Sequence, residues 1–299
     1  MKFISTKEFI YRNARPLDVA RFRFLFGFGT IDDVLNCLSY YQNEDGGFGH
    51  GLELDCQNPN SSPMQTLVAT QIINEIGGLN KEHNMICGIL DYLSSKKDFD
   101  GSFWANTIAT NNDYPHAPWW NYNPNVKSYN PTASLAGFIL LYGKKDSEIY
   151  NIAKRVAKEA YLYFKNNCPI ESMHTVVCFV ELYEYLKQAD VNLVDMDEYY
   201  SLLIKQLSAL LSVDTTNWDK EYVARPSLYI SSKESDFYKP FINECKSECD
   251  FIRNTMKNDG TWTINWEWDS YPEEWAVVKN YWKCDQAIRN LKFYFGVSN

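Results

Sequence analysis

The turn Asp45-Gly46-Gly47-Phe48 is repeated twice further along the chain, as Asp100-Gly101-Ser102-Phe103 and Asp259-Gly260-Thr261-Trp262. Each copy reads Asp, Gly, a small residue and an aromatic residue, and each follows a predicted helix. Asp-Gly favours a tight turn with a positive φ at the glycine. The aromatic side chain two residues later can fold back between neighbouring helices. The first two copies lie 55 residues apart and the last two lie 159 apart, close to three such intervals. This spacing predicts repeated helical hairpins.

Helical periodicity dominates the segments between these turns. In the segment 31–41, apolar residues recur at 31, 34, 35 and 38 on one stripe. The same kind of pattern predicts further helices at 63–76, 81–94, 130–143, 147–166, 171–188, 196–212, 236–257 and 272–295. No stretch shows the alternating pattern of a β-strand. The sequence therefore predicts an all-α chain of roughly ten to twelve helices, forming a single domain over residues 1–299.

Composition limits the classes of function. Hydrophobic residues make up 45% of the 299 residues, which is enough for a sizeable core. The 38 acidic and 29 basic residues give a net charge of −9, which disfavours binding to nucleic acid or to an anionic membrane. Aromatic residues reach 16%, which indicates an aromatic core or a pocket for a ligand with apolar or stackable faces.

The expected compartment is the cytoplasm. The first residues contain no apolar run typical of a secretory signal, and no window approaches the length of a membrane span. The eight cysteines are accordingly expected to be reduced. Cys245 and Cys249 share a helix face, but no second pair of metal ligands stands nearby, so no metal site is predicted there.

The segment Gln42-Asn43-Glu44-Asp45-Gly46-Gly47-Phe48-Gly49 resembles the glutamine–aromatic repeat of the terpenoid cyclase and protein prenyltransferase superfamily. The segments 97–104 and 257–262 are similar to that repeat but lack its glutamine. The resemblance covers the repeated turns and the adjoining helices, and would make the chain a divergent small member of bacterial type. It implies an α/α toroid, a barrel of helical hairpins whose inner helices surround a cavity. It identifies architecture better than activity.

The catalytic motifs of that superfamily do not carry over. The Asp-x-Asp-Asp acid motif of class II cyclases is absent from the chain. The segment 282–287 falls where prenyltransferases place part of a zinc triad, yet no histidine follows His174. No Asp-Asp-x-x-Asp motif for magnesium-bound diphosphate is present. We therefore expect no cofactor, and nothing in the sequence supports a magnesium site.

A polar segment after the first turn holds the first group of candidate residues. His50, Glu53 and Asp55 are the catalytic candidates in it, and Asn58 is a candidate ligand contact. Glu53 and Asp55 are two residues apart, so an extended loop would aim both carboxylates the same way. Such a pair can divide into one protonated acid and one ionised base. The alternative is a polar loop that uses Asp55 and Asn58 for turns and helix capping.

The segment 113–124 forms the second group. It contains two histidine-flanking prolines and several aromatic residues, and an exposed Trp-Trp pair would be costly. Trp119, Trp120 and Asn121 are candidate substrate contacts, because indole faces stabilise cations and stack on sugars. His116 is the best single acid–base candidate, since the ordinary imidazole pKa lies near neutrality. The alternative is a loop that merely fills space with aromatic side chains.

The third group follows the last turn. Trp266, Glu267 and Trp268 alternate along a short extended strip and are candidate substrate contacts, although packing under the last helix is an equally good interpretation. Arg225 could present its guanidinium to an anion such as a diphosphate. Asp285 is four residues before Arg289, a spacing typical of a surface ion pair.

Three functions remain open at this point. The first is a cyclase-like or prenyltransferase-like enzyme that binds an isoprenoid in an aromatic cavity and starts the chemistry with Glu53, Asp55 or His116. The second is a carbohydrate-active toroid with tryptophan platforms, in which Glu53 or Asp55 pairs with Glu267 or Asp269. The third is a toroid that binds a small ligand or a partner without catalysis. The first predicts a deep apolar cavity, whereas the second predicts an open polar cleft.

Overall fold

The computed structural model describes residues 3–212 and 214–298. It is all-helical in this part of the chain: eleven α-helices and four short 3₁₀ helices, with isolated β-bridges in place of sheets. The predicted fold class, all-α, is confirmed. The chain divides into two compact units, with unit 1 comprising residues 1–37 and 210–299 and unit 2 comprising residues 38–209. The single domain over 1–299 stays a prediction.

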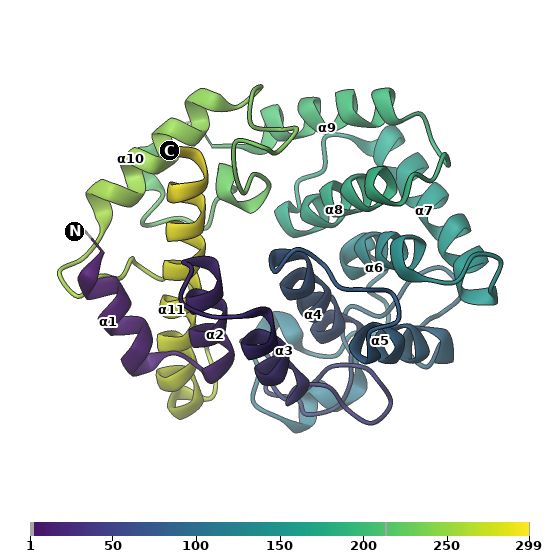
Figure 1. The fold of residues 1–299 in the computed structure, drawn as a ribbon, viewed down its shortest axis with the longest axis horizontal. Coiled ribbons are helices and arrows are strands. Elements are labelled where there is room, and N and C mark those ends of the chain that lie inside the picture. Colours follow the sequence, from purple (N-terminus) through teal and green to yellow (C-terminus); the bar gives the residue numbers. More distant parts are fainter. Residues whose placement is uncertain (1–2, 213, 299) are drawn as a thin grey trace. The chain divides into compact units, whose positions relative to one another are not determined.

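The helices are joined by short turns in some places and by long loops before α4, α6 and α10 (Figure 1). Their bounds are α1 (Ile4–Asn13), α2 (Pro16–Leu25), α3 (Ile31–Ser39), α4 (Pro63–Glu75), α5 (Asn84–Ser95), α6 (Tyr129–Tyr142), α7 (Glu148–Asn167), α8 (Met173–Ala189), α9 (Met196–Leu210), α10 (Ile242–Thr255) and α11 (Pro272–Ser298). The 3₁₀ helices are η1 (Ala109–Asp113), η2 (Pro118–Trp120), η3 (Thr215–Asn217) and η4 (Pro226–Leu228). The sequence pattern does not predict helices α1 and α2.

Unit 2 contains the helices α4 to α9, and the successive helices α6 and α7 pack directly on each other. Helix α6 packs between α4 and α8, and α5 packs on α7, so that α4, α6 and α8 lie side by side (Figure 1). Almost every side chain of α6 is buried, which explains its nearly uninterrupted apolar sequence. Gly137 lets α8 approach α6 closely, because a Cβ there would lie 2.8 Å from the Tyr185 ring.

The helix α9 is fixed to its neighbours by one buried tyrosine. The Tyr199 ring lies 5.8 Å from Phe164 on α7, and its hydroxyl donates a hydrogen bond of 2.9 Å to the Phe179 carbonyl on α8. Phe164 in turn stacks on Phe179 at 4.7 Å. Aromatic contacts of this kind add to the area that the side chains bury, so the high aromatic content of the chain serves its core in part.

Unit 1 contains a buried network of charges that joins α2 to α11. Asp18 is fully buried and accepts hydrogen bonds from Arg15 (2.8 Å) and Arg21 (3.1 Å). Arg21 also donates to Asp285 at 2.9 Å, and Arg289 Nε lies 2.6 Å from the other Asp285 oxygen. The Asp285–Arg289 pair therefore exists, but Asp285 is 4% exposed rather than at the surface.

The three repeated turns share one backbone design. Gly46, Gly101 and Gly260 all have positive φ angles, of 84°, 102° and 83°. In each copy the aspartate side chain accepts a hydrogen bond from the backbone N–H two residues later, at 2.9–3.0 Å. The sequence motif thus corresponds to one recurring local structure, as expected for a repeat.

The aromatic anchor is displaced by one residue in the second turn. Phe48 is fully buried and its N–H donates to Thr66 Oγ1 at 3.2 Å. In the second copy, the equivalent hydrogen bond is donated by the Trp104 N–H to Thr132 Oγ1, at 3.0 Å. Trp104 is buried, whereas Phe103 is only half-buried. The residue after the predicted aromatic is therefore the one that fixes this turn to the next helix.

No helix in residues 3–212 and 214–298 is long and apolar enough to cross a membrane.

Candidate functional site

The first two groups of candidate residues lie together in unit 2. The Gln57 N–H donates to the Pro115 carbonyl at 2.9 Å, and the Ala117 N–H donates to the Asp55 carbonyl at 2.8 Å. These two hydrogen bonds form an antiparallel bridge between Cys56 and His116. We call the segments 49–58 and 114–121 the paired loops. Side chains that are sixty residues apart in sequence are thus held in one fixed arrangement.

His116 is held on both sides by its own loop. Its Nδ1 lies 2.6 Å from the Tyr114 carbonyl and its Nε2 lies 2.9 Å from Asn121 Oδ1. The Asn121 amide nitrogen donates to the Pro118 carbonyl at 2.8 Å, which fixes the orientation of the amide. Both neighbours of the ring are therefore acceptor oxygens. His116 is 4% exposed.

The three other catalytic candidates differ in access to solvent. His50 is exposed, with a φ of 59°, and its Nε2 lies 2.8 Å from Asn43 Oδ1. Asp55 is 4% exposed, and its backbone N–H lies 3.3 Å from Glu53 Oε1. Glu53 is half-buried. Among the acids of the paired loops, Glu53 thus combines a defined position with access from outside.

Asn58 serves the local structure with every group of its side chain. Its amide nitrogen donates to Thr110 Oγ1 and Asn111 Oδ1, both at 2.9 Å, while its Oδ1 accepts from the Asn60 backbone N–H. The Asn58 carbonyl accepts from Gln65 on α4 at 2.8 Å. Asn58 is fully buried, so its hydrogen bonds stabilise the paired loops and it does not present a free polar group to a ligand.

The tryptophan pair is divided between solvent and the interior. Trp119 is 47% exposed and Trp120 is half-buried, both within η2. The Trp120 carbonyl accepts a hydrogen bond of 3.0 Å from Asn111. Asn121, two residues after Trp119, is also exposed. This part of the paired loops thus exposes one indole side chain.

The third group lies in unit 1. Trp266 packs edge-on against Tyr222 and Trp282, at 5.3 and 5.2 Å between ring centroids, and Trp268 is buried in a stack on Trp275 at 5.6 Å. Glu267 is exposed. The two indoles thus pack under the start of α11, which is the alternative that the sequence left open.

Arg225 also lies in unit 1 and faces both a carboxylate and an aromatic ring. Its Nε is 3.5 Å from Glu248 Oε1, and its guanidinium lies 5.5 Å from the centre of the Phe251 ring. Glu248 is fully buried and accepts short hydrogen bonds from the Ser227 backbone N–H (2.7 Å) and hydroxyl (2.6 Å).

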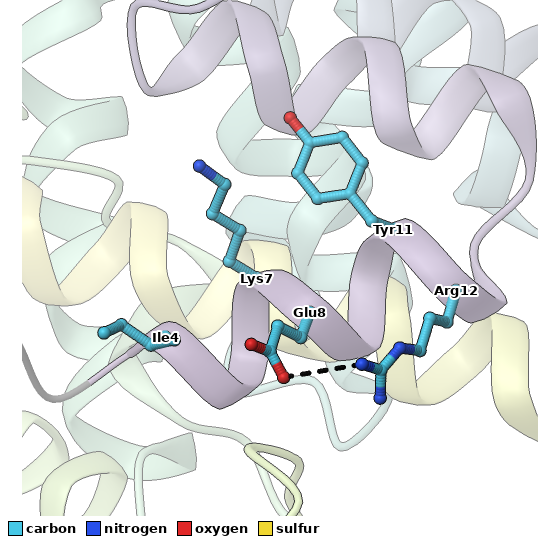
Figure 2. Close-up of a pocket in the computed structure, with 5 residues that line it drawn as sticks. All are labelled: Ile4, Lys7, Glu8, Tyr11 and Arg12. Atoms are coloured by element: carbon cyan, nitrogen blue, oxygen red, sulfur yellow. Dashed lines mark ion pairs between the residues drawn. The ribbon is translucent and has the colours of Figure 1, made fainter.

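A surface hollow of about 390 Å³ lies along α1 and contains none of the candidate residues (Figure 2). Ile4 and Tyr11 are exposed on this face, and the Lys7 ammonium lies 5.8 Å from the centre of the Tyr11 ring. Glu8 and Arg12 form an exposed ion pair at 3.7 Å. Open surface of this kind adds little to affinity or stability.

Sequence reasoning missed one buried acid in unit 2. Glu181 on α8 accepts a hydrogen bond of 2.8 Å from Gln71 on α4, while its Oε2 is buried without a partner in the part of the chain that the structure describes. Burial raises the pKa of Glu181 to about 7, and the nearby Ser134 hydroxyl and the Gln71 amide lower it in part. The helix pattern places Glu181 among apolar residues, but the environment comes from α4 and α6.

Among the described residues, no group of three or more His, Cys, Asp or Glu side chains could hold a metal ion. The comparisons with known proteins add no relative: no protein-family model, no curated protein and no solved structure matches this chain.

Proposed function

We propose that the helical hairpins of this chain form an α/α toroid of the terpenoid cyclase and prenyltransferase type. Two observations support the proposal. The Asp-Gly turns share one backbone geometry in all three copies, and α4, α6 and α8 form one layer within unit 2. An experimentally determined structure would test the ring, because an open stack of hairpins would contradict it.

On this architecture, the proposed function is an isoprenoid-binding enzyme whose chemistry starts at the paired loops. The observation that carries the proposal is the backbone pairing of residues 55–57 with 115–117, which joins the candidate acids to the tryptophan pair. A reaction through carbocations needs a positioned acid and ring faces that stabilise positive charge. Glu53 would supply the acid, and Trp119 and Trp120 the ring faces.

Carbohydrate binding at the same loops is the second candidate function. It is favoured by Trp119, an indole side chain of the paired loops that is 47% exposed. Sugars commonly bind with their apolar face on an aromatic ring and their hydroxyl groups on amides and carboxylates. In a glycoside hydrolase, Glu53 would need a second carboxylate at about 5–10 Å.

A binding screen with farnesyl and geranylgeranyl diphosphates beside a panel of oligosaccharides tests both candidates. If the isoprenoid function is correct, mass spectrometry should show saturable binding of the diphosphates. It should also show conversion of the diphosphate to a product, and this conversion should be lost in Glu53→Gln. The control is Glu44→Gln, since Glu44 is exposed on the adjacent turn and has no hydrogen bond or ion pair within residues 3–212 and 214–298.

The outcomes separate the candidates. Binding of sugars alone, weakened by Trp119→Ala, would establish the second function and contradict the first. Absence of binding by either class, or equal loss in Glu53→Gln and Glu44→Gln, would contradict the placement of the working site in the paired loops.

A further inference from the structure

Unit 1 contains a partly open cavity of about 280 Å³ that the proposed function does not use. Its walls come from four parts of the chain: the segment after η3, the residue before η4, the end of α10 with the third turn, and α11. Its lining includes Trp218, Arg225, Phe251, Lys257, Trp262 and Gln286. We call this space the unit 1 cavity. Its volume lies just below the range for ligand pockets, about 300–1,000 Å³, so it would hold only a small ligand.

Three rigid aromatic side chains form the apolar part of the wall. The rings of Trp218 and Phe251 meet edge-to-face at 5.4 Å. Trp262 is 2% exposed, and its Nε1 donates a hydrogen bond of 2.9 Å to the Ile252 carbonyl. Because the third turn fixes the Trp262 backbone and this bond fixes its ring, the apolar wall is already formed without a ligand.

Two cations face the same space. Lys257 is exposed, and its ammonium group makes no ion pair within the part of the chain that the structure describes. Arg225 has five N–H donors, and its Nε contact with Glu248 is long at 3.5 Å. Since Ser227 already donates two short hydrogen bonds to Glu248, the guanidinium retains donors for a further acceptor.

Two polar atoms in the wall lack partners among the described residues. Trp218 is 4% exposed, and its Nε1 is buried with no acceptor. The Oε1 of Gln286 is buried with no donor, although its Nε2 donates to the Thr263 carbonyl at 3.2 Å. Buried polar groups are nearly always paired in native proteins, so an unpaired donor and an unpaired acceptor beside one cavity point to a missing partner.

We propose that the unit 1 cavity binds a small organic oxyanion with a flat apolar body, a carboxylate or a phosphate monoester. The oxyanion accepts hydrogen bonds from Arg225, Lys257 and the Trp218 indole. The bonds from the two cations are charge-assisted and therefore stronger than neutral ones. The apolar body lies against Phe251 and Trp262. A hydroxyl or protonated oxygen of the ligand donates to Gln286. Asp219, also in the wall and exposed, limits the site to ligands of low negative charge.

Isothermal titration calorimetry with phenyl phosphate tests this proposal on the full chain. We expect saturable binding with one ligand per chain, weakened as ionic strength rises. Lys257→Met should weaken it about tenfold, which corresponds to the loss of one charge-assisted hydrogen bond. Lys246→Met is the matched control, because Lys246 is exposed on α10 outside the cavity and its loss changes the net charge equally.

Further probes separate the parts of the proposal. Phenol should bind far more weakly than phenyl phosphate, and so should inorganic phosphate. Equal binding of phenol would overturn the role of the cations, and equal binding of inorganic phosphate would overturn the role of the aromatic wall. Absence of saturable binding below about 1 mM, or equal effects of Lys257→Met and Lys246→Met, would overturn the site itself. None of these outcomes depends on the function of the paired loops.

Discussion

Glu181 shows how one residue can make stability depend on pH. Burial raises the pKa of its carboxyl group from 4.5 to about 7. In the folded chain the carboxyl therefore keeps its proton between pH 4.5 and 7, where the unfolded chain releases it. The contribution of Glu181 to the free energy of unfolding is fully present below pH 4.5 and is lost as the pH rises through 7.

The substitution Glu181→Gln removes this titration and keeps a neutral side chain of the same shape beside Gln71. We expect the variant to exceed the original chain in unfolding free energy at pH 8, by on the order of 1–3 kcal/mol, and to match it closely at pH 5. Urea unfolding at both pH values measures the difference. Glu171→Gln, at an exposed position of unit 2, should show no such dependence, and a parallel gain there would contradict the assignment.

The two histidines of the paired loops should respond differently to truncation. His116 is buried and lies within hydrogen-bond distance of two acceptors, so His116→Ala leaves both unsatisfied and a cavity behind. We expect it to cost about 2–4 kcal/mol in unfolding free energy. His50→Ala removes one exposed contact with Asn43 and should cost about 1 kcal/mol or less. Equal costs would mean that the loops are not packed as described.

At the scale of elements, the repeated glycines allow a matched comparison. Gly46 and Gly101 both have a positive φ, but a Cβ at Gly46 would lie 2.1 Å from the Gly88 carbonyl on α5, whereas a Cβ at Gly101 would meet nothing within 4 Å. Gly101→Ala should therefore cost only the backbone strain, about 1–2 kcal/mol. Gly46→Ala must also displace α5 and should cost more than about 3 kcal/mol. Thermal unfolding of both variants measures the difference, and equal melting temperatures would show that the first turn does not contact α5.

The pattern of elements could largely be predicted because the sequence pattern of a helix is local. The stripe from Ile31 predicts α3, and Pro63 after Ser62 marks the start of α4, whose cap is indeed the Ser62 side chain, which accepts from the Gln65 N–H. Helix α2 was missed because its five buried residues, all within Leu17–Phe22, include the charged residues Asp18 and Arg21. Asp18 pairs with Arg15 and Arg21 from its own segment, and α11 adds Asp285 as a second partner of Arg21.

The sequence marks the residues of the candidate site, but it does not predict the contacts of their side chains. The density of His, Glu and Asn marks the paired loops in the sequence. That His116 is enclosed by Tyr114 and Asn121, or that Asn58 supports Thr110, follows from contacts between loops that no spacing reveals. Glu181 could not be predicted from the sequence at all. A single acid on an apolar helix forms no motif, and its environment is set by two other helices.

At the scale of the whole chain, the two units should respond to pH in opposite directions. In unit 1, burial by itself would raise the pKa of Asp285, but Arg289 and Arg21 outweigh it and hold that pKa below 3.8. The stability that Asp285 contributes is therefore present above pH 3.8 and is lost as the pH falls through its folded pKa. In unit 2, Glu181 contributes stability that is lost as the pH rises.

Hydrogen exchange followed by mass spectrometry can separate these contributions, because it reports protection for each helix. From pH 6 to pH 8, after correction for the intrinsic exchange rate, we expect α4, α6 and α8 to lose more protection than α2 and α11. Glu248 of unit 1 also has a raised pKa because of its burial, which Arg225 and Ser227 oppose in part, so the loss of protection in unit 1 should be smaller than in unit 2 but not absent. Below pH 4 the order should reverse, with α2 and α11 opening first. Equal changes in both units at both ends would show that the chain unfolds as one cooperative body, because local titration then acts on the stability of the whole molecule.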